Sequence, residues 1–226
     1  MRTTRMILTS LLWATVVTAT FAQEAKVEIK QDNNKIVIKN RSGLTSFDVE
    51  VRGKIELTDD DKDIKSMSSD GYLEIKKTVF GSRRTLIVSP NAGGLLKEYY
   101  EGRTKIPFDP AGKEWMAEIL PELVRSTTIG SESRVDRFFK KGGTSAVLNE
   151  IRNLQSNYVQ SHYASLLMTQ KVNIKDYPRI IDEMADIMDS DYYLANFLKK
   201  NMDRFIKSSE GLEAVFKATG NIDSDY

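Results

Sequence analysis

The most constraining feature of this 226-residue sequence is a repeat in its C-terminal part. Four sets of similar residues recur every 34 residues: Ser156, Ser190 and Ser224; Tyr158, Tyr192 and Tyr226; Val147, Ile181 and Val215; Leu154, Met188 and Ile222. A period of this length is typical of stacked helical hairpins, in which each unit buries its apolar face against the next. The sequence therefore predicts an array of α-helical hairpin repeats over residues 143–226.

The turn within each repeat has a physical role in this prediction. Ser190 or Asp191 can accept a hydrogen bond from a free amide in the first turn of the next helix. Tyr192 is expected to pack at the hairpin corner with its ring in the core; the alternative is a row of tyrosines that lines a ligand groove. Tetratricopeptide repeats share the length, but their residue pattern is missing, so we predict HEAT-like hairpins.

The last residues of the sequence extend this pattern. Ser224 and Asp225 are placed to cap a helix that would follow Tyr226. We therefore expect the repeats to be truncated here and to continue in a longer natural chain.

Residues 23–104 are predicted to form an antiparallel β domain. Apolar residues alternate with polar ones, as in Ile36/Ile38 and Leu73/Ile75, which is the period of half-buried strands. The turns SSDGY (68–72) and SPNAGG (89–94) are expected to close hairpins. Seven or eight short strands are expected, in a sandwich or β-stack. The predicted fold class is α+β, with this β-region first and the helical repeats after it.

Residues 105–142 are predicted to form connecting helices. Asp109 is expected to cap the first helix, with Pro110 at its first position, and Pro121 is expected to kink or split it. A second helix is predicted over residues 131–139, ending at KKGGT (140–144).

Residues 1–22 have the composition of a secretory signal peptide. Arg2 and Arg5 precede an apolar run, and Thr20-Phe21-Ala22 supplies a small-x-small cleavage signal. An uncleaved membrane anchor is the alternative, but the run is shorter than the about 20 residues that span a bilayer. The sequence predicts export to a bacterial periplasm or cell surface, without membrane insertion after cleavage.

Charge and cysteine content narrow the class of protein further. The sequence has 33 basic and 32 acidic residues, and loss of Arg2 and Arg5 would leave one net negative charge. This balance disfavours nucleic acid as a partner, which would need a basic excess. The sequence has no cysteine, so an exported chain of this size must be stabilised by its hydrophobic core rather than by disulfides.

The sequence offers few candidates for catalysis or metal binding. His162, its one histidine, is predicted to be a surface residue rather than a catalytic base. No Gly-x-Ser-x-Gly motif accompanies the serines. TDDDKD (58–63) has the alternating aspartates that begin a calcium loop, but Ile64 stands where that loop needs glycine, so a solvated turn is expected. We predict no catalytic, cofactor-binding or metal-binding residues and no cofactor.

Several stretches resemble a poorly characterised bacterial extracytoplasmic module. They are GYLEIKK (71–77), RRTLIV (83–88), YYEG (99–102), the segment 107–143 and the SDY repeats. The resemblance covers roughly residues 53–226. This module is associated with exported hypothetical proteins and with antirepressor-type membrane metallopeptidases. It implies a β-region followed by helical repeats, and no established activity. The His-Glu-x-x-His zinc motif needs two histidines, so no catalytic residue is carried over.

Two classes of function are compatible with these observations. The first is an exported, non-catalytic protein-interaction or sensing module whose helical array binds a protein or peptide. The alternative is a carboxylate-dependent hydrolase with its site between the β domain and the helices, which predicts two carboxylates whose pKa values are pushed apart. The absence of a catalytic motif favours the first.

Overall fold

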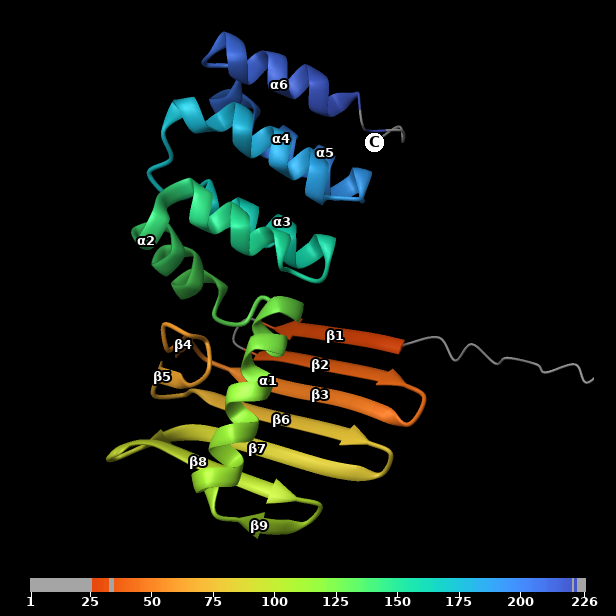
Figure 1. Ribbon diagram of the computed structural model, residues 1–226, viewed down its shortest axis with the longest axis vertical. Helices are drawn as coiled ribbons and strands as arrows, with labels where there is room; N and C mark the ends of the chain where they lie inside the picture. The colour runs from red at the N-terminus through yellow and green to blue at the C-terminus, as the bar shows by residue number, and fades with distance from the viewer. Residues whose placement is uncertain (1–25, 33–34, 221, 223–226) are drawn as a thin grey trace, which may run out of the picture.

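The structure, a computed structural model, describes residues 26–32, 35–220 and 222. In this part of the chain an antiparallel β-sheet is followed by helices, which confirms the predicted α+β class (Figure 1). The predicted signal peptide (1–22) lies outside the described residues. Among the helices that are described, none is both long enough and apolar enough to cross a membrane.

Seven of the strands form one antiparallel sheet in the order β1-β2-β3-β6-β7-β8-β9. They are β1 (Lys26–Asp32), β2 (Lys35–Ser42), β3 (Thr45–Arg52), β6 (Tyr72–Val79), β7 (Ser82–Asn91), β8 (Gly94–Glu101) and β9 (Thr104–Ile106). Strands β4 (Ile55–Leu57) and β5 (Ile64–Met67) pair with each other and interrupt the meander between β3 and β6.

The second layer of the β domain is a helix rather than a second sheet, so the arrangement is neither a sandwich nor a β-stack. Helix α1 (Lys113–Ser126) lies across one face of the sheet (Figure 1). The buried side chains between them are Ile38, Val49, Val51, Leu73, Ile75, Leu86, Val88 and Tyr99 from the sheet and Trp115, Met116, Ile119, Leu120, Leu123 and Val124 from α1. The helix suffices because one continuous apolar stripe can cover the alternating apolar positions of the strands.

The two predicted hairpin turns have different outcomes. SPNAGG does join β7 to β8, which pair in register up to Asn91 and Gly94. The SSDGY prediction is wrong, because β5 and β6 belong to different sheets and residues 68–71 only connect them. Gly71 is required there by close packing: a Cβ on it would lie 2.7 Å from the Ser68 carbonyl oxygen.

The start of α1 and the effect of Pro121 also differ from the prediction. Asp109 lies in the irregular turn Phe108–Gly112, whereas α1 begins at Lys113, directly after Gly112, and has no side-chain cap. The helix runs through Pro121 to Ser126 without splitting. A proline inside a helix costs about 3 kcal/mol. Burial of Leu120 and its apolar neighbours against the sheet is of the same order per side chain and offsets this cost.

Helix α2 (Ser131–Arg152) contains the break that KKGGT predicts. Gly142 and Gly143 have non-helical φ and ψ, and Gly143 has a φ of 61°. The helix resumes at Thr144 instead of stopping. Its first half therefore lies next to the β domain, and its second half begins the helical array.

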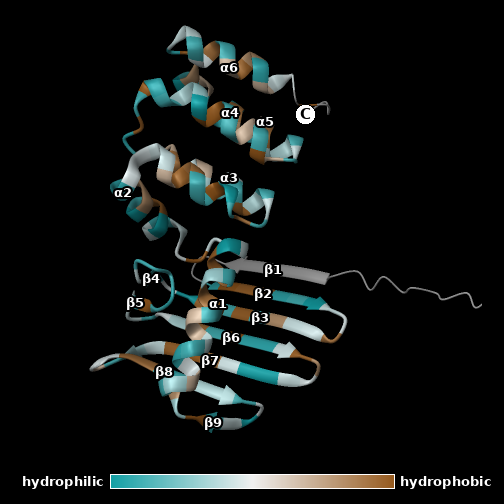
Figure 2. Cartoon of the chain, in the orientation of Figure 1, coloured by the Kyte–Doolittle hydropathy of each residue, from teal (hydrophilic) through white to brown (hydrophobic). Residues whose placement is uncertain are grey.

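The array continues with four helices that are stacked away from the sheet (Figure 1). They are α3 (Asn157–Leu167), α4 (Tyr177–Ile187), α5 (Asp191–Phe205) and α6 (Ser209–Thr219). Hydrophobic and hydrophilic segments alternate along them in Figure 2, as expected for helices with one buried face. The short turn Ile174–Asp176 precedes α4.

The 34-residue repeat has a direct counterpart in space. Val147, Ile181 and Val215 are all buried in the core of the array, and so are Leu154 and Met188. Polar contacts repeat the same offset: Arg152 to Asp186, Gln170 to Asp136 and Arg179 to Ser145 are hydrogen bonds between residues 34 apart. Each unit therefore stacks on the equivalent part of the next one.

The predicted capping of the repeat turns is only partly present. Ser156 accepts a hydrogen bond from the amide of Val159 at 3.3 Å and caps α3. Ser190 makes no side-chain cap on α5. Ser224 lies outside the described residues.

Candidate functional site

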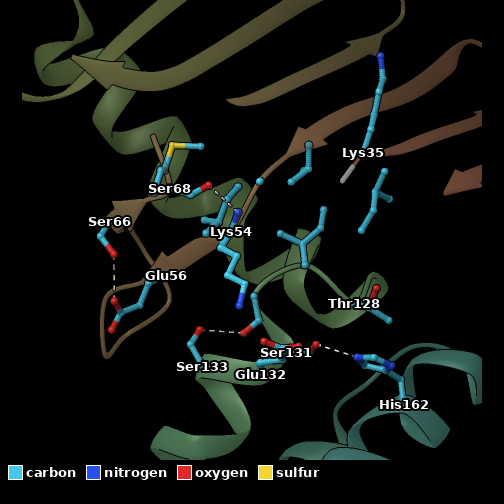
Figure 3. A pocket seen from close by; sticks show the side chains of 17 residues that line it. Lys35, Lys54, Glu56, Ser66, Ser68, Thr128, Ser131, Glu132, Ser133 and His162 are labelled. Atoms are coloured by element: carbon cyan, nitrogen blue, oxygen red, sulfur yellow. Dashed lines mark hydrogen bonds between the residues drawn. The ribbon is translucent and has the colours of Figure 1, made fainter. Parts of the chain in front are cut away.

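A cavity of about 640 Å³ lies at the junction of the β domain and the helical array. Its walls come from β2, the end of β3, β4 and β5, from the start of α2 and the loop that leads into it, and from α3 (Figure 3). The charged or polar side chains that line it include Lys35, Lys54, Glu56, Ser66, Ser68, Thr128, Ser131, Glu132, Ser133 and His162. Cavities of this volume are typical of small-ligand sites, and they often form where domains meet.

Ser131 and His162 form a close pair of potentially reactive groups in this cavity. Gly130 precedes Ser131 with a φ of 68°, and a Cβ at Gly130 would lie 2.5 Å from Leu57. The tight left-handed turn therefore places Ser131 as the first residue of α2, with 3% of its surface exposed. The Ser131 Oγ lies 2.9 Å from the Nε2 of His162 on α3 (Figure 3).

His162 lines the cavity and is less exposed than the predicted surface position implies. The ring is half-buried beside Ser131. Burial lowers its pKa, and the charge of Glu132 partly opposes this by raising it. Because burial disfavours the charged imidazolium, the ring is neutral at pH 7 and one of its nitrogens can accept a proton.

The first turn of α2 keeps backbone donors near this pair. No side chain caps the helix. The amide of Ser131 donates to the Thr128 carbonyl at 3.2 Å, and the Ser133 hydroxyl donates to the Gly130 carbonyl at 3.0 Å. The amides of the next two residues have no carbonyl four positions earlier within the helix. Lys54 extends toward this turn in Figure 3, which adds positive charge.

Two carboxylates also line the cavity, Glu56 and Glu132. Glu56 accepts hydrogen bonds from Lys65 and Ser66, both at 2.9 Å, and these bonds lower its pKa. A carboxylic acid that serves as a general acid needs the opposite shift. Within the described residues no group of three or more His, Asp and Glu side chains is placed to hold a metal ion.

A buried ion network joins the β domain to the array beside this cavity. Arg134, on the first half of α2, is 1% exposed. Its guanidinium donates to Asp61 at 2.8 and 3.1 Å, to Glu150 at 2.6 Å and to the hydroxyl of Tyr163. Arg137 donates to the other oxygen of Asp61 at 2.6 Å. The first half of α2 thus holds one carboxylate from the β4–β5 turn and one from the second half of the same helix.

The pKa values in this network favour the charged forms. Burial alone would raise the pKa of Asp61, but the hydrogen bonds and charges of Arg134 and Arg137 outweigh it and lower the pKa. Burial also opposes the charge on Arg134, and Asp61, Tyr163 and Glu150 together raise its pKa. Asp61 and Arg134 therefore stay ionised at neutral pH.

The segment TDDDKD (58–63) is a turn in which Asp59, Asp60 and Lys62 are exposed, as predicted, but Asp61 is not fully solvated. Asp61 has a φ of 59°, and its half-buried carboxylate faces α2. Its neighbours pair elsewhere: Asp59 with Lys141 at 3.3 Å and Asp63 with Lys97 at 2.5 Å. The three alternating carboxylates thus point to different cations rather than to one another.

The tyrosines of the repeat form an exposed cluster, and the prediction that Tyr192 packs in the core is wrong. Tyr158 is 40% exposed and Tyr192 is 53% exposed. Between them lies Tyr193, with ring centroids 6.4 Å from Tyr158 and 5.2 Å from Tyr192. The core position at this corner is taken by Leu194, which is 2% exposed. Tyr158 and His162 are four residues apart on α3, so the cluster and the cavity share one helix face.

Comparisons with known proteins add no relative for this site. No protein-family model, no curated protein and no solved structure matches the chain.

Proposed function

We propose that the chain is an exported interaction module whose helical array binds an extended segment of a protein or peptide. The observation that supports this most directly is the exposure of Tyr158 and Tyr192 at equivalent positions of successive repeats, with Tyr193 between them. Exposed aromatic side chains that gather on one surface are typical of binding sites, and tyrosine is enriched among the residues that carry binding energy.

The binding face would extend from the tyrosine cluster to the junction cavity. Tyr158 lies one turn before His162, and His162 lines the cavity. An extended ligand bound across the first turns of α3 and α5 would therefore have one end in the cavity. Stacked helical repeats commonly bind extended segments along such a face.

The finer identity of the array and the location of the protein belong to this proposal. The helix pairs are best described as HEAT-like, since they have a 34-residue offset and lack the tetratricopeptide pattern. Export to the periplasm or cell surface rests on the composition of residues 1–22 and on the absence of cysteine. The resemblance to a bacterial extracytoplasmic module supports the same location.

A selection from a random peptide library tests this function directly. Selected peptides should bind the wild-type protein and lose about thirtyfold in affinity on Tyr158→Ala or Tyr192→Ala, because an aromatic hot spot contributes about 2 kcal/mol. Phe216→Ala is the matched control, since Phe216 is an aromatic residue on α6 that is 69% exposed. Peptides that depend on Phe216 but not on the tyrosines, or no enrichment at all, would contradict the proposed face.

A further inference from the structure

We propose that Ser131 is a nucleophile toward ester and amide carbonyls, with His162 as its general base. This activity goes beyond the binding function and does not depend on it. The Ser131 Oγ and the His162 Nε2 are 2.9 Å apart, within the distance over which a positioned imidazole can take a hydroxyl proton.

The partner of Ser131 distinguishes it from other serines of the described chain. The hydroxyls of Ser126, Ser133 and Ser165 donate to backbone carbonyls, which cannot accept a proton in a reaction. Ser131 instead faces an imidazole that burial keeps neutral. The reaction requires the tautomer in which Nδ1 carries the proton and Nε2 has a free lone pair.

The cavity provides room for an acyl substrate at this pair. Both residues line its volume of about 640 Å³. Its lining also includes Ile36, Val51 and Met67, which suit an apolar acyl group. Substrates of this class are small esters or amides with an apolar acyl part.

The first turn of α2 is placed to stabilise the charge that the reaction creates. Attack of Oγ on the carbonyl carbon forms the new C–O bond, transfers the hydroxyl proton to Nε2 and leaves a negative charge on the carbonyl oxygen. The amides of Glu132 and Ser133, at an uncapped helix start, can donate to that oxygen. Collapse of this intermediate breaks the bond to the leaving alcohol or amine, which takes the proton from His162.

The second half of the reaction is expected to be slow. In hydrolysis of the acyl-Ser131, a water molecule attacks the acyl carbon and passes a proton to His162; the bond to Oγ then breaks, and Oγ takes that proton back. No carboxylate hydrogen-bonds the His162 ring in the described part of the chain; Glu132 acts on it only through its charge. Loss of the carboxylate that orients a catalytic histidine lowers kcat by about 10⁴ in a serine protease. His162 is the base in both acylation and hydrolysis, so turnover should be slow and the test should not depend on it.

Labelling with a fluorescent fluorophosphonate tests the nucleophile without requiring turnover. The probe forms a P–O bond to Ser131 and loses fluoride, while His162 takes the proton. We expect one label per full-length chain, located at Ser131 by peptide mass spectrometry and lost on Ser131→Ala. His162→Gln should slow labelling by about 10²-fold or more. Ser165→Ala, which removes a hydroxyl on α3 that donates only to the Ser161 carbonyl, should label at the wild-type rate.

The pH dependence of the labelling rate gives a second test. It uses the wild-type protein, so a variant that fails to fold cannot affect the result. The labelling rate should be constant above pH 7 and should fall only below the ordinary histidine pKa of 6.5, because burial lowers the pKa of His162. Wild-type labelling no faster than that of Ser131→Ala would overturn the inference. So would labelling of Ser131 at an unchanged rate in folded His162→Gln, because this would indicate mere accessibility.

Discussion

Replacing Arg134 with methionine should lower the free energy of unfolding by about 3–5 kcal/mol, the cost of removing one partner from a buried ion pair. The side chain is 1% exposed and donates to Asp61, Glu150 and Tyr163. Without it, the one cation that stays within 4 Å of Glu150 among the described residues is Arg125, at 3.8 Å. Asp61 still has Arg137, so the loss should fall in the lower part of this range.

The assay is urea denaturation followed by two signals. Trp115 lies in the core of the β domain and is 4% exposed; Trp13→Phe in the background makes its fluorescence specific. Far-ultraviolet circular dichroism reports chiefly the helices. In the wild type the two transitions should coincide, because the network couples the two cores. In Arg134→Met they should separate.

Two further variants control this experiment. Arg125→Met removes a half-exposed cation 3.8 Å from Glu150 and should cost less than about 1 kcal/mol. Arg134→Met with Glu150→Leu should regain part of the loss, because an apolar pair leaves no buried charge unpaired. A loss below 1 kcal/mol in Arg134→Met, with coincident transitions, would refute the role of the network.

Two other predictions concern stability. Tyr192→Ala should change the free energy of unfolding by less than about 1 kcal/mol, since the ring is 53% exposed. Phe197→Ala should cost about 3–5 kcal/mol, because the Phe197 side chain in the same helix is 1% exposed. Thermal melts of both variants distinguish a surface role of Tyr192 from a core role. The pKa of Asp61 is lowered in the folded state, so its stabilisation is fully present above the ordinary value of 3.8 and is lost as the pH falls through the folded pKa. Urea midpoints measured from pH 5 down to 2 should fall less steeply in Asp61→Asn; equal slopes would contradict the assignment.

Local periodicity predicted the larger features of the fold correctly. Alternation such as Leu73/Ile75 identifies a half-buried strand without knowledge of its partners, and the 34-residue columns identify stacked units. The predicted core role of Tyr192 is wrong because an aromatic residue that recurs with the repeat is not necessarily a packing residue. Leu194 and Phe197 already fill the core of α5, so the ring lies outside it.

The candidate site could not be predicted because its contacts join distant parts of the chain. Ser131 and His162 are 31 residues apart, and Arg134 and Asp61 are 73 apart. Neither pair has a spacing that local geometry dictates. One feature of the sequence indicates the network: Arg134 lies four residues before Phe138, so the two share a face of the predicted helix. A cation on an apolar face requires a buried anion from elsewhere.

The β4–β5 hairpin is inserted between two strands that are already neighbours in the sheet. A short turn from β3 to β6 would complete the seven-stranded meander without it. Asp61, which binds Arg134 of α2, therefore lies in an inserted hairpin, outside the backbone hydrogen bonds that join β3 to β6. An insertion or deletion in the β4–β5 hairpin would change the angle between the helices and the sheet, while the backbone hydrogen bonds of the seven-stranded sheet stayed the same. Over evolutionary time, the same sheet could in this way present its array in different directions.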